Sequence, residues 1–294
     1  MHDDIPDIDE AALRQAIAEV AAALSCLPLR PLEHRGTDTA LYRLGTRYLL
    51  RVPRRADAIP GFLAESRWLP HLAAHLPLAV PTIRATGALP TDPPLPWCLQ
   101  DWIEGVDASA APIFDPEDLA ERLAAGLLAL RRVPLPAAPP TGARGGDLAS
   151  QDAAFRAAKR AASEKGIGGL APAIAAWDCG LAAGPWRGAP VWLHGDLVPG
   201  NLILSGGRLK ALIDWAFIGV GDPAYDLIPA WFLFEGASRA RFLEALAPDE
   251  ATLARARARV AWQCVLALPF YLETNPAMVR LARGGIARLS DGGP

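Results

Sequence analysis

One stretch of this 294-residue chain, between residues 191 and 226, interrupts a second half that otherwise follows a helical pattern. Within it, short apolar runs at 202–204 and 209–213 flank the tripeptide Ser-Gly-Gly at 205–207. Apolar runs joined by a glycine-containing turn are typical of a β-hairpin. The sequence therefore predicts a β-hairpin at this one place in a mostly helical region.

Three polar residues gather at the open end of this hairpin. Asn201 stands just before the first strand, Asp214 just after the second, and Asp196 lies five residues before Asn201. The two ends of an antiparallel hairpin lie side by side, offset by about 7 Å along the strand. Carboxylate and amide oxygens suit Mg²⁺, which completes its shell with water and phosphate. A further carboxylate can accept a hydroxyl proton, so the cluster predicts phosphoryl transfer from a nucleotide.

The first third of the chain predicts a small sheet. An amphipathic helix is expected over 8–24 from the spacing of its apolar residues. Glycine-centred turns then separate short apolar runs, which indicates antiparallel strands. The expected elements are strands near 31–35, 40–44, 47–52 and 97–100, with a helix near 61–75.

Most of the remaining chain predicts helices. The run that begins at Asp115 has this residue as N-cap and Pro116 in the first turn, and it ends before Pro134. The stretch 134–146 is rich in Pro, Gly and Ala and is expected to form a loop. Further helices are expected near 150–165, 171–182, 238–247, 250–272 and 276–289, with Arg255, Arg257 and Arg259 on a helix surface.

Composition and charge narrow the class of protein. A hydrophobic content of 51% excludes wholesale disorder. A formal net charge of −3 provides no basic field for nucleic acid or anionic lipid. The N-terminus is acidic where a signal peptide is basic, and no apolar run reaches the roughly 18 residues that span a bilayer. We expect a cytoplasmic protein, monomer or homodimer, with no nucleic-acid or membrane partner.

The four cysteines carry no recognisable motif. Cys26, Cys98, Cys179 and Cys264 are far apart, with no C-x-x-C pair among them. Their spacing predicts neither a disulfide framework nor a zinc site.

The ordered set H-G-D-x-x-x-x-N at 194–201, I-D-W at 213–215 and G-D-P-A-Y-D-L at 221–227 resembles the aminoglycoside phosphotransferase and choline kinase-like family. The resemblance extends over residues 30–290, roughly. It implies an α+β, protein-kinase-like two-lobe fold. A small antiparallel-sheet N-terminal lobe would cover 1–102 and a larger, mainly helical C-terminal lobe 103–294.

The same resemblance implies the roles of individual residues. Asp196 matches the catalytic Asp of the family, and Asn201 and Asp214 match its metal ligands. The turn at 36–39 resembles a short phosphate-covering loop, whose backbone N–H groups can bind phosphate oxygens. Arg51 replaces the usual Lys but keeps the charge and can bind phosphate in a bidentate way. The implied nucleotide-binding residues are Gly36, Thr37, Thr39, Arg51, its ion-pair partner Glu65, and the hinge backbone at Asp101 and Ile103.

Residues beside these motifs have simpler expected roles. His194 is expected to hold the catalytic loop by hydrogen bonds, and Asp226 to brace the same loop through its backbone. Asp222 precedes Pro223, so it is expected to cap a helix, with contact to an acceptor as the alternative. The aromatic residues at 231–234 are expected in the core, with pocket lining as the alternative.

The expected activity is transfer of the γ-phosphate of ATP or GTP, with Mg²⁺, to a hydroxyl of a small molecule such as an aminoglycoside-type antibiotic. One alternative is a kinase of an endogenous metabolite of the amino alcohol, homoserine or sugar class. A second is a nucleotide-binding pseudokinase, for which the Arg51 replacement is the only support. A third is a metal-dependent hydrolase built on His194, Asp196 and Asp214, which needs more ligands than the five His offer.

The acceptor is left open by the sequence. A polycationic acceptor favours a carboxylate-rich cleft, and an apolar macrolide favours an apolar one. The residues available for the first are Asp101, Glu104, Asp107 and Glu235, and those available for the second are Trp231 and Phe232.

Overall fold

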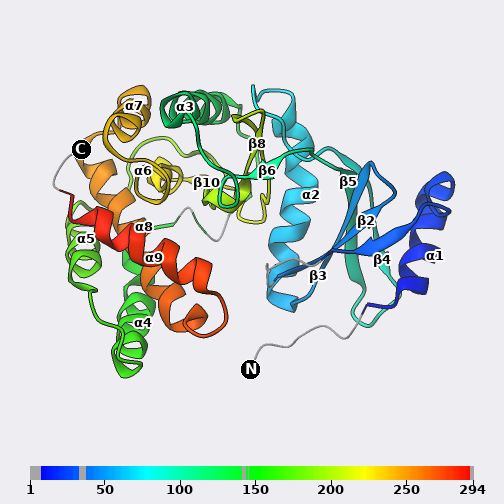
Figure 1. The fold of residues 1–294 in the computed structure, drawn as a ribbon, viewed down its shortest axis with the longest axis horizontal. Helices are drawn as coiled ribbons and strands as arrows, with labels where there is room; N and C mark the ends of the chain where they lie inside the picture. Colours follow the sequence, from blue (N-terminus) through cyan, green and yellow to red (C-terminus); the bar gives the residue numbers. More distant parts are fainter. Residues whose placement is uncertain (1–7, 33–37, 141–143, 145, 292–294) are drawn as a thin grey trace.

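The computed structural model describes residues 8–32, 38–140, 144 and 146–291 of the chain, arranged in two lobes (Figure 1). The smaller one, here called the sheet lobe, is built on a five-stranded antiparallel sheet of order β1-β2-β3-β5-β4. Its strands are β1 (Leu29–Pro31), β2 (Thr39–Leu44), β3 (Tyr48–Pro53), β4 (Ile83–Leu89) and β5 (Leu95–Asp101).

Two helices flank this sheet. Helix α1 (Glu10–Ala21) lies on the side away from the second lobe, and α2 (Ile59–Ala73) on the side that faces it (Figure 1). The α1 residues Leu13 and Ile17 share one apolar core with Leu50 of β3 and Leu99 of β5. The apolar face of α1 is thus buried against the sheet.

Helix α2 belongs to both lobes by its contacts. Its Glu65 reaches Arg51 of the sheet, whereas Leu69 and Leu72 join the apolar core of the second lobe. The Trp68 ring also lies 5.6 Å, between centroids, from the ring of Trp192 in the second lobe. The helix therefore connects the sheet to the structure that carries the hairpin.

The second lobe, here called the helical lobe, is organised around α8 (Glu250–Tyr271), which contacts α4, α5, α9 and the short helix η5 (Pro223–Leu227). Its apolar core contains the buried rings of Trp177, Trp215 and Trp231. The remaining helices are α3 (Pro116–Arg132), α4 (Asp152–Glu164), α5 (Ala171–Ala182), α6 (Pro229–Phe232), α7 (Gly236–Leu246) and α9 (Pro276–Leu289).

Two small antiparallel sheets stand between these helices. One has the order β6-β8-β9, from Val106–Asp107, Leu202–Ser205 and Arg208–Leu212, and the other joins β7 (Val191–Leu193) to β10 (Gly219–Gly221). The pair β8–β9 is the predicted hairpin. Because β6 pairs with β8, the chain passes from the sheet lobe to the helical lobe between β5 and β6.

The α+β two-lobe fold is confirmed, and the differences from the sequence prediction are local. Strand β1 lies at 29–31, and part of the predicted strand 31–35 falls outside the described residues. Strand β4 was not predicted, because its residues alternate between half-buried and exposed and include several small ones. No helix in the described part of the chain has the length and hydropathy of a bilayer-spanning segment.

A close contact between α2 and the helical lobe gives a first prediction. A Cβ at Gly61 would lie 2.3 Å from the carbonyl oxygen of Ala216, well below the 3.4 Å at which ordinary contact begins. Gly61→Ala should displace α2 and lower the free energy of unfolding by about 1–3 kcal/mol, because overpacking strains both elements. Denaturant unfolding measures this change.

The matched control is Gly168→Ala, because a Cβ at Gly168 meets nothing within 4 Å. This variant should stay within about 0.5 kcal/mol of the wild type. Equal unfolding midpoints for the two variants would show that α2 is not held against the Ala216 carbonyl.

Candidate active site

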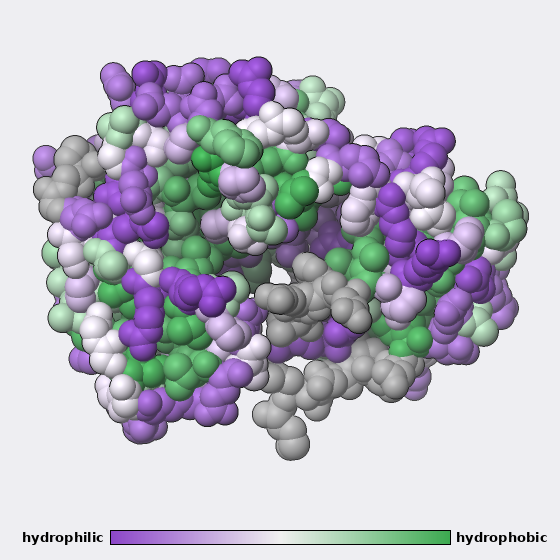
Figure 2. Space-filling view, viewed as in Figure 1, coloured by the Kyte–Doolittle hydropathy of each residue, from purple (hydrophilic) through white to green (hydrophobic). Residues whose placement is uncertain are grey.

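A cleft of about 1460 Å³ lies between the lobes, and the surface is visibly hollowed there (Figure 2). The sheet lobe contributes Thr39 and Arg51 to its walls, and the segment 100–103 contributes the connection between the lobes. The helical lobe contributes Asp196, Asn201 and Asp214. The residues that the sequence selected from distant segments therefore face one cavity.

The side chain of Asn201 joins the two ends of the segment 196–201, part of the predicted catalytic loop at 194–201. Its Nδ2 donates to the backbone oxygen of Asp196 at 2.8 Å and to the Asp196 Oδ2 at 3.3 Å. Its own backbone oxygen accepts from the amide of Ile213 at 2.9 Å, which brings the second hairpin strand alongside. Because Nδ2 is bound to Asp196, the amide oxygen is the atom of Asn201 left for a cation.

Asp214 follows the hairpin in a left-handed conformation, with φ of 59°. Asp tolerates this region better than most residues, because its short polar side chain can bond locally. Its side chain is 48% exposed, and its Oδ1 lies 3.5 Å from Nη2 of Arg51. The turn thus presents a carboxylate to the cleft, opposite the sheet lobe.

Arg51 and Glu65 form a buried ion pair at the back of the cleft. Nη1 of Arg51 lies 2.5 Å from Oε1 of Glu65, and both side chains are almost fully buried. Burial alone would lower the pKa of Arg51, but the carboxylates of Glu65 and Asp214 outweigh it and hold this pKa above its ordinary value. The guanidinium therefore stays charged, and the structure places the predicted partners in contact.

The carboxylate of Asp226 holds the catalytic loop through the backbone, as expected. Its Oδ2 accepts from the amide of His194 at 2.8 Å and its Oδ1 from that of Gly195 at 2.9 Å. Gly195 has φ of +82°, and a Cβ there would lie 2.6 Å from the carbonyl oxygen of Phe217. Only glycine fits this turn without strain.

The ring of His194 is also part of this support. It is fully buried; its Nδ1 accepts from the amide of Asp196 at 3.2 Å, and its Nε2 lies 3.1 Å from the carbonyl oxygen of Ile213. Burial lowers the pKa of His194. The two contacts assign a lone pair to Nδ1 and the hydrogen to Nε2, which is a neutral tautomer. The contacts favour the expected loop-holding role over catalysis.

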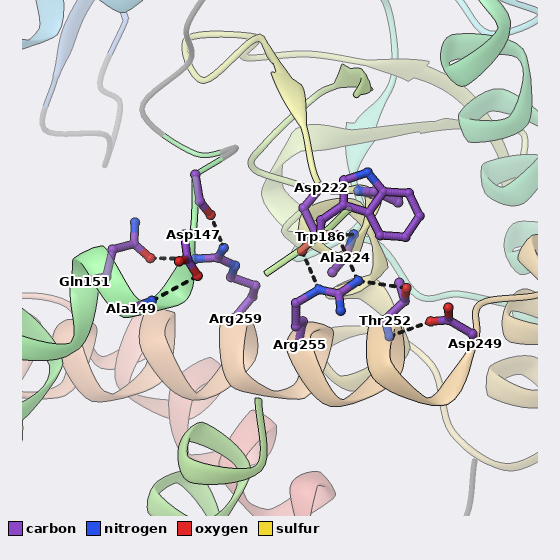
Figure 3. Close-up of polar contacts among 12 residues, drawn as sticks. Asp147, Ala149, Gln151, Trp186, Asp222, Ala224, Asp249, Thr252, Arg255 and Arg259 are labelled. Carbon is purple, nitrogen blue, oxygen red and sulfur yellow. Dashed lines mark hydrogen bonds and ion pairs between the residues drawn. The ribbon is translucent and has the colours of Figure 1, made fainter. Parts of the chain in front are cut away.

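Asp222 caps η5, and its carboxylate is also bound by an arginine of α8 (Figure 3). Its Oδ1 accepts from the amide of Ala224 at 3.0 Å, and its Oδ2 accepts from Nε of Arg255 at 2.7 Å. Arg255 donates in addition to Oγ1 of Thr252 at 2.9 Å. Because η5 carries Asp226, the ion pair connects α8 to the support of the catalytic loop.

The prediction that the α8 arginines lie on a helix surface is wrong for two of them. Arg255 is 3% exposed and Arg259 is 1% exposed, whereas Arg257 is half-buried. Arg259 donates to Oε1 of Gln151 at 2.5 Å and to the backbone oxygen of Gly146 (Figure 3). Arg255 and Arg259 are four residues apart and therefore lie on one face of the helix. This spacing was the sequence feature that could have indicated a shared buried environment.

Of the predicted nucleotide-binding residues, Thr39, Arg51, Asp101 and Ile103 line the cleft, and Glu65 lies behind Arg51. Gly36 and Thr37 lie outside the described residues. Phe232 also lines the cleft, whereas Trp231 and Phe234 are buried in the core.

One contact of the catalytic loop comes from a segment that the sequence left as a loop. Nη1 of Arg144 donates to Oδ1 of Asp196 at 2.7 Å. Burial raises the pKa of the Asp196 carboxyl, and the positive charge of Arg144 opposes that rise.

The hydrolase alternative requires a metal site made of several His, Cys, Asp or Glu side chains. Among the described residues, no group of three or more of these is arranged to hold a metal.

The two lobes, the cleft and the loop that carries Asp196 together have the architecture of a kinase-like phosphotransferase. The family model of the phosphotransferase enzyme family matches residues 11–262. The chain belongs to this family of small-molecule phosphotransferases. None of the curated proteins searched matches the sequence.

Solved phosphotransferase structures share the fold. Macrolide 2'-phosphotransferase MphH from Brachybacterium faecium has 24% identity and a TM-score of 0.62, with 94% of this chain and 97% of that chain covered. Macrolide 2'-phosphotransferase type I has 22% identity and a TM-score of 0.63, covering 97% and 98%. The GDP complex of aminoglycoside 2'-phosphotransferase-IIIa has 14% identity and a TM-score of 0.71, covering 96% and 99%.

The buried pair between α8 and η5 gives a second prediction. Arg255→Met should lower the free energy of unfolding by about 3–5 kcal/mol, because it leaves the Asp222 carboxylate buried without its partner. Thermal and denaturant unfolding measure the loss. Arg160→Ala, at an exposed position of α4, is the control and should change little.

A second variant separates charge from packing. Arg255→Met combined with Asp222→Asn keeps a capping oxygen and removes the unpaired charge, so it should be more stable than Arg255→Met alone. Unfolding of Arg255→Met at the wild-type midpoint would contradict the importance of this pair.

Proposed function

We propose that the protein transfers the γ-phosphoryl group of ATP or GTP, with Mg²⁺, to a hydroxyl of a small molecule bound in the cleft. The observation that carries this proposal is the convergence of Asp196, Asn201 and Asp214 on one wall, with Arg51 facing them at 3.5 Å from Asp214. Arg51 comes from the sheet lobe and the other three from the helical lobe, so the fold brings Arg51 to them. Family membership and the shared architecture support the same conclusion.

The donor set fits a magnesium ion. Asp214 offers a half-exposed carboxylate, and Asn201 offers an amide oxygen whose paired nitrogen already donates to Asp196. One carboxylate and one neutral oxygen, completed by phosphate and water, are the usual protein ligands of Mg²⁺ at a nucleotide. When bound, the ion neutralises charge on the phosphates.

Asp196 is the residue proposed to take part in the transfer. The oxygen of the acceptor hydroxyl bonds to the γ-phosphorus as the bond from that phosphorus to the bridging oxygen breaks. The electron pair of the broken bond leaves with the nucleoside diphosphate, and the hydroxyl proton passes to the Asp196 carboxylate. Asn201 and Arg144 fix this carboxylate by hydrogen bonds to its two oxygens.

The nucleotide is proposed to lie against the sheet lobe. Arg51 is charged and buried on one side, with its guanidinium open towards Asp214, so it is placed to bind phosphate. The segment 100–103 lines the cleft where the base would meet the backbone of Asp101 and Ile103. Relatives of the same fold are described as ADP and GDP complexes, which supports a nucleotide donor of either base.

The opposite end of the cleft is where the acceptor is proposed to bind, and its lining favours an acceptor with an apolar body. Among the described residues from 217 onward that line the cleft, none is acidic. The same part of the wall contains Arg280 and Arg288; Glu235 neutralises Arg288, and the charge of Arg280 repels a polycation. The lining residues concerned are Phe217, Ile218, Phe232, Leu233, Tyr271, Asn275, Ala277, Met278, Arg280, Leu281, Gly284 and Arg288.

Three of the four carboxylates available for a cationic acceptor lie beside arginines. Asp101 binds Arg84 at 2.5 Å, Glu235 binds Arg288 at 2.5 Å, and Glu104 lies 3.5 Å from Arg43. The fourth, Asp107, lines the cleft and accepts from the backbone amide of Ser109 at 2.9 Å. We therefore propose a macrolide-like acceptor in preference to an aminoglycoside-type one. Of the two remaining alternatives, a kinase of a metabolite of the amino alcohol, homoserine or sugar class is preferred to a pseudokinase.

The function is tested by incubating the protein with Mg²⁺, ATP or GTP and a panel of macrolides, aminoglycosides, amino alcohols, homoserine and sugars. Mass spectrometry should detect a product heavier by one phosphate. Asp214→Asn should retain the fold by circular dichroism but lose Mg²⁺-dependent nucleotide binding by calorimetry. Undiminished binding in this variant would refute the metal assignment, and nucleotide binding without any product would favour the pseudokinase.

Arg51 gives a separate prediction. Arg51→Ala should raise the KM for nucleotide or lower kcat by about 10-fold or more, because charge-assisted hydrogen bonds contribute about 1.5–3 kcal/mol. Arg51→Lys should recover part of that loss by restoring the charge. Steady-state kinetics with the best acceptor measures both, and normal turnover by Arg51→Ala would place the phosphate contact elsewhere.

A further inference from the structure

The side chain of Arg144 enters the active site from outside the catalytic loop. Its Nη1 donates to Oδ1 of Asp196 at 2.7 Å and to the backbone oxygen of Gly195 at 3.2 Å. Its guanidinium carbon lies 3.7 Å from the centroid of the Phe217 ring. These contacts involve two adjacent residues of the catalytic loop and an aromatic ring beyond Asp214, so the guanidinium is enclosed on several sides.

The catalytic loop has no positive charge of its own. Residues 194–201 read His-Gly-Asp-Leu-Val-Pro-Gly-Asn, without Lys or Arg. Arg51, which lines the cleft from the sheet lobe, is bound to Glu65 and directed at Asp214. Asp196 and Asp214 are like charges in one cavity, so a cation beside Asp196 offsets their repulsion. Arg144 provides that cation.

The position of Arg144 is supported from α8. The backbone oxygen of Gly146, two residues further along the chain, accepts from Nη2 of Arg259, whose Nη1 donates to Oε1 of Gln151 at 2.5 Å (Figure 3). Arg259 is 1% exposed, and its guanidinium carbon lies 3.9 Å from the centroid of the Tyr225 ring. Gly146 is thus bound to a buried side chain of the central helix.

We propose that Arg144 is a positioning residue for phosphoryl transfer, which fixes the Asp196 carboxylate toward the acceptor hydroxyl, while Arg259 binds Gly146 two residues further along the chain. The inference rests on the proposed function. Oδ1 of Asp196 is bound by Arg144 and Oδ2 by Asn201, so the carboxylate cannot rotate freely. Each carboxylate oxygen has a second lone pair, which leaves one available for the hydroxyl proton.

The experiment compares Arg144→Ala, Arg144→Lys and the exposed control Arg160→Ala with the wild type. Arg144→Ala should lower kcat by about 10- to 100-fold, because misplacing a reacting group by 1 Å can cost about 100-fold. The KM values for nucleotide and acceptor should stay unchanged, and circular dichroism should show that the variant is folded. Arg144→Lys should recover part of kcat, and Arg160→Ala should behave as the wild type.

A double-mutant cycle tests whether Arg144 acts through Asp196. In an Asp196→Asn background, Arg144→Ala should cause little further loss of residual turnover, because the carboxylate that it positions is already gone. Calorimetric binding of Mg²⁺-nucleotide should be the same with and without Arg144→Ala. Losses that multiply, or a raised acceptor KM at unchanged kcat, would overturn the positioning role in favour of direct substrate contact.

The result also separates this inference from the function on which it rests. Wild-type turnover with an unchanged kcat in Arg144→Ala would overturn the role of Arg144 alone. No phosphorylated product from the wild type with any acceptor would overturn the proposed function and this inference together.

Discussion

The buried ion pair between Arg51 and Glu65 is the interaction on which the arrangement of the cleft depends. A strand and a helix are joined by it, and the free side of the guanidinium faces Asp214 of the other lobe. Buried ion pairs contribute little net stability compared with apolar residues of the same shape, because desolvation offsets their attraction. The pair is therefore better explained by the need for a charge of fixed direction at that point.

On the opposite side of the cleft, the helical lobe also holds a charged group in a fixed direction, through carboxylates that bind backbone amides. Asp226 binds two consecutive N–H groups of the catalytic loop, and Asp222 caps the short helix on which Asp226 stands. Arg255 of α8 then neutralises Asp222 inside the core. The position of Asp196 thus depends on a series of hydrogen bonds that begins at a central helix, in addition to the bonds from His194 and Asn201 of its own loop.

The sequence predicted those parts of the site that depend on local spacing. Asp196, Asn201 and Asp214 lie within one hairpin and its approach, so their distances along the chain were enough to place them together. Arg144 and Arg259 could not be placed in this way, because their partners are 52 and 108 or more residues away. The same limit applies to β4, whose weakly apolar residues become a strand only by pairing with β5.

Helix α2 contacts both lobes, and this limits how the lobes can move relative to each other. The C-terminal half of α2 is packed in the helical core through Leu69 and Leu72, whereas Glu65 is bound to the sheet. A rigid rotation of one lobe about the connection at 102–105 would tear this helix from one of its two sets of contacts. An opening that preserves the packing of Leu69 and Leu72 would instead carry α2 with the helical lobe and shift the sheet against the helix, at the cost of contacts between α2 and strands β4 and β5.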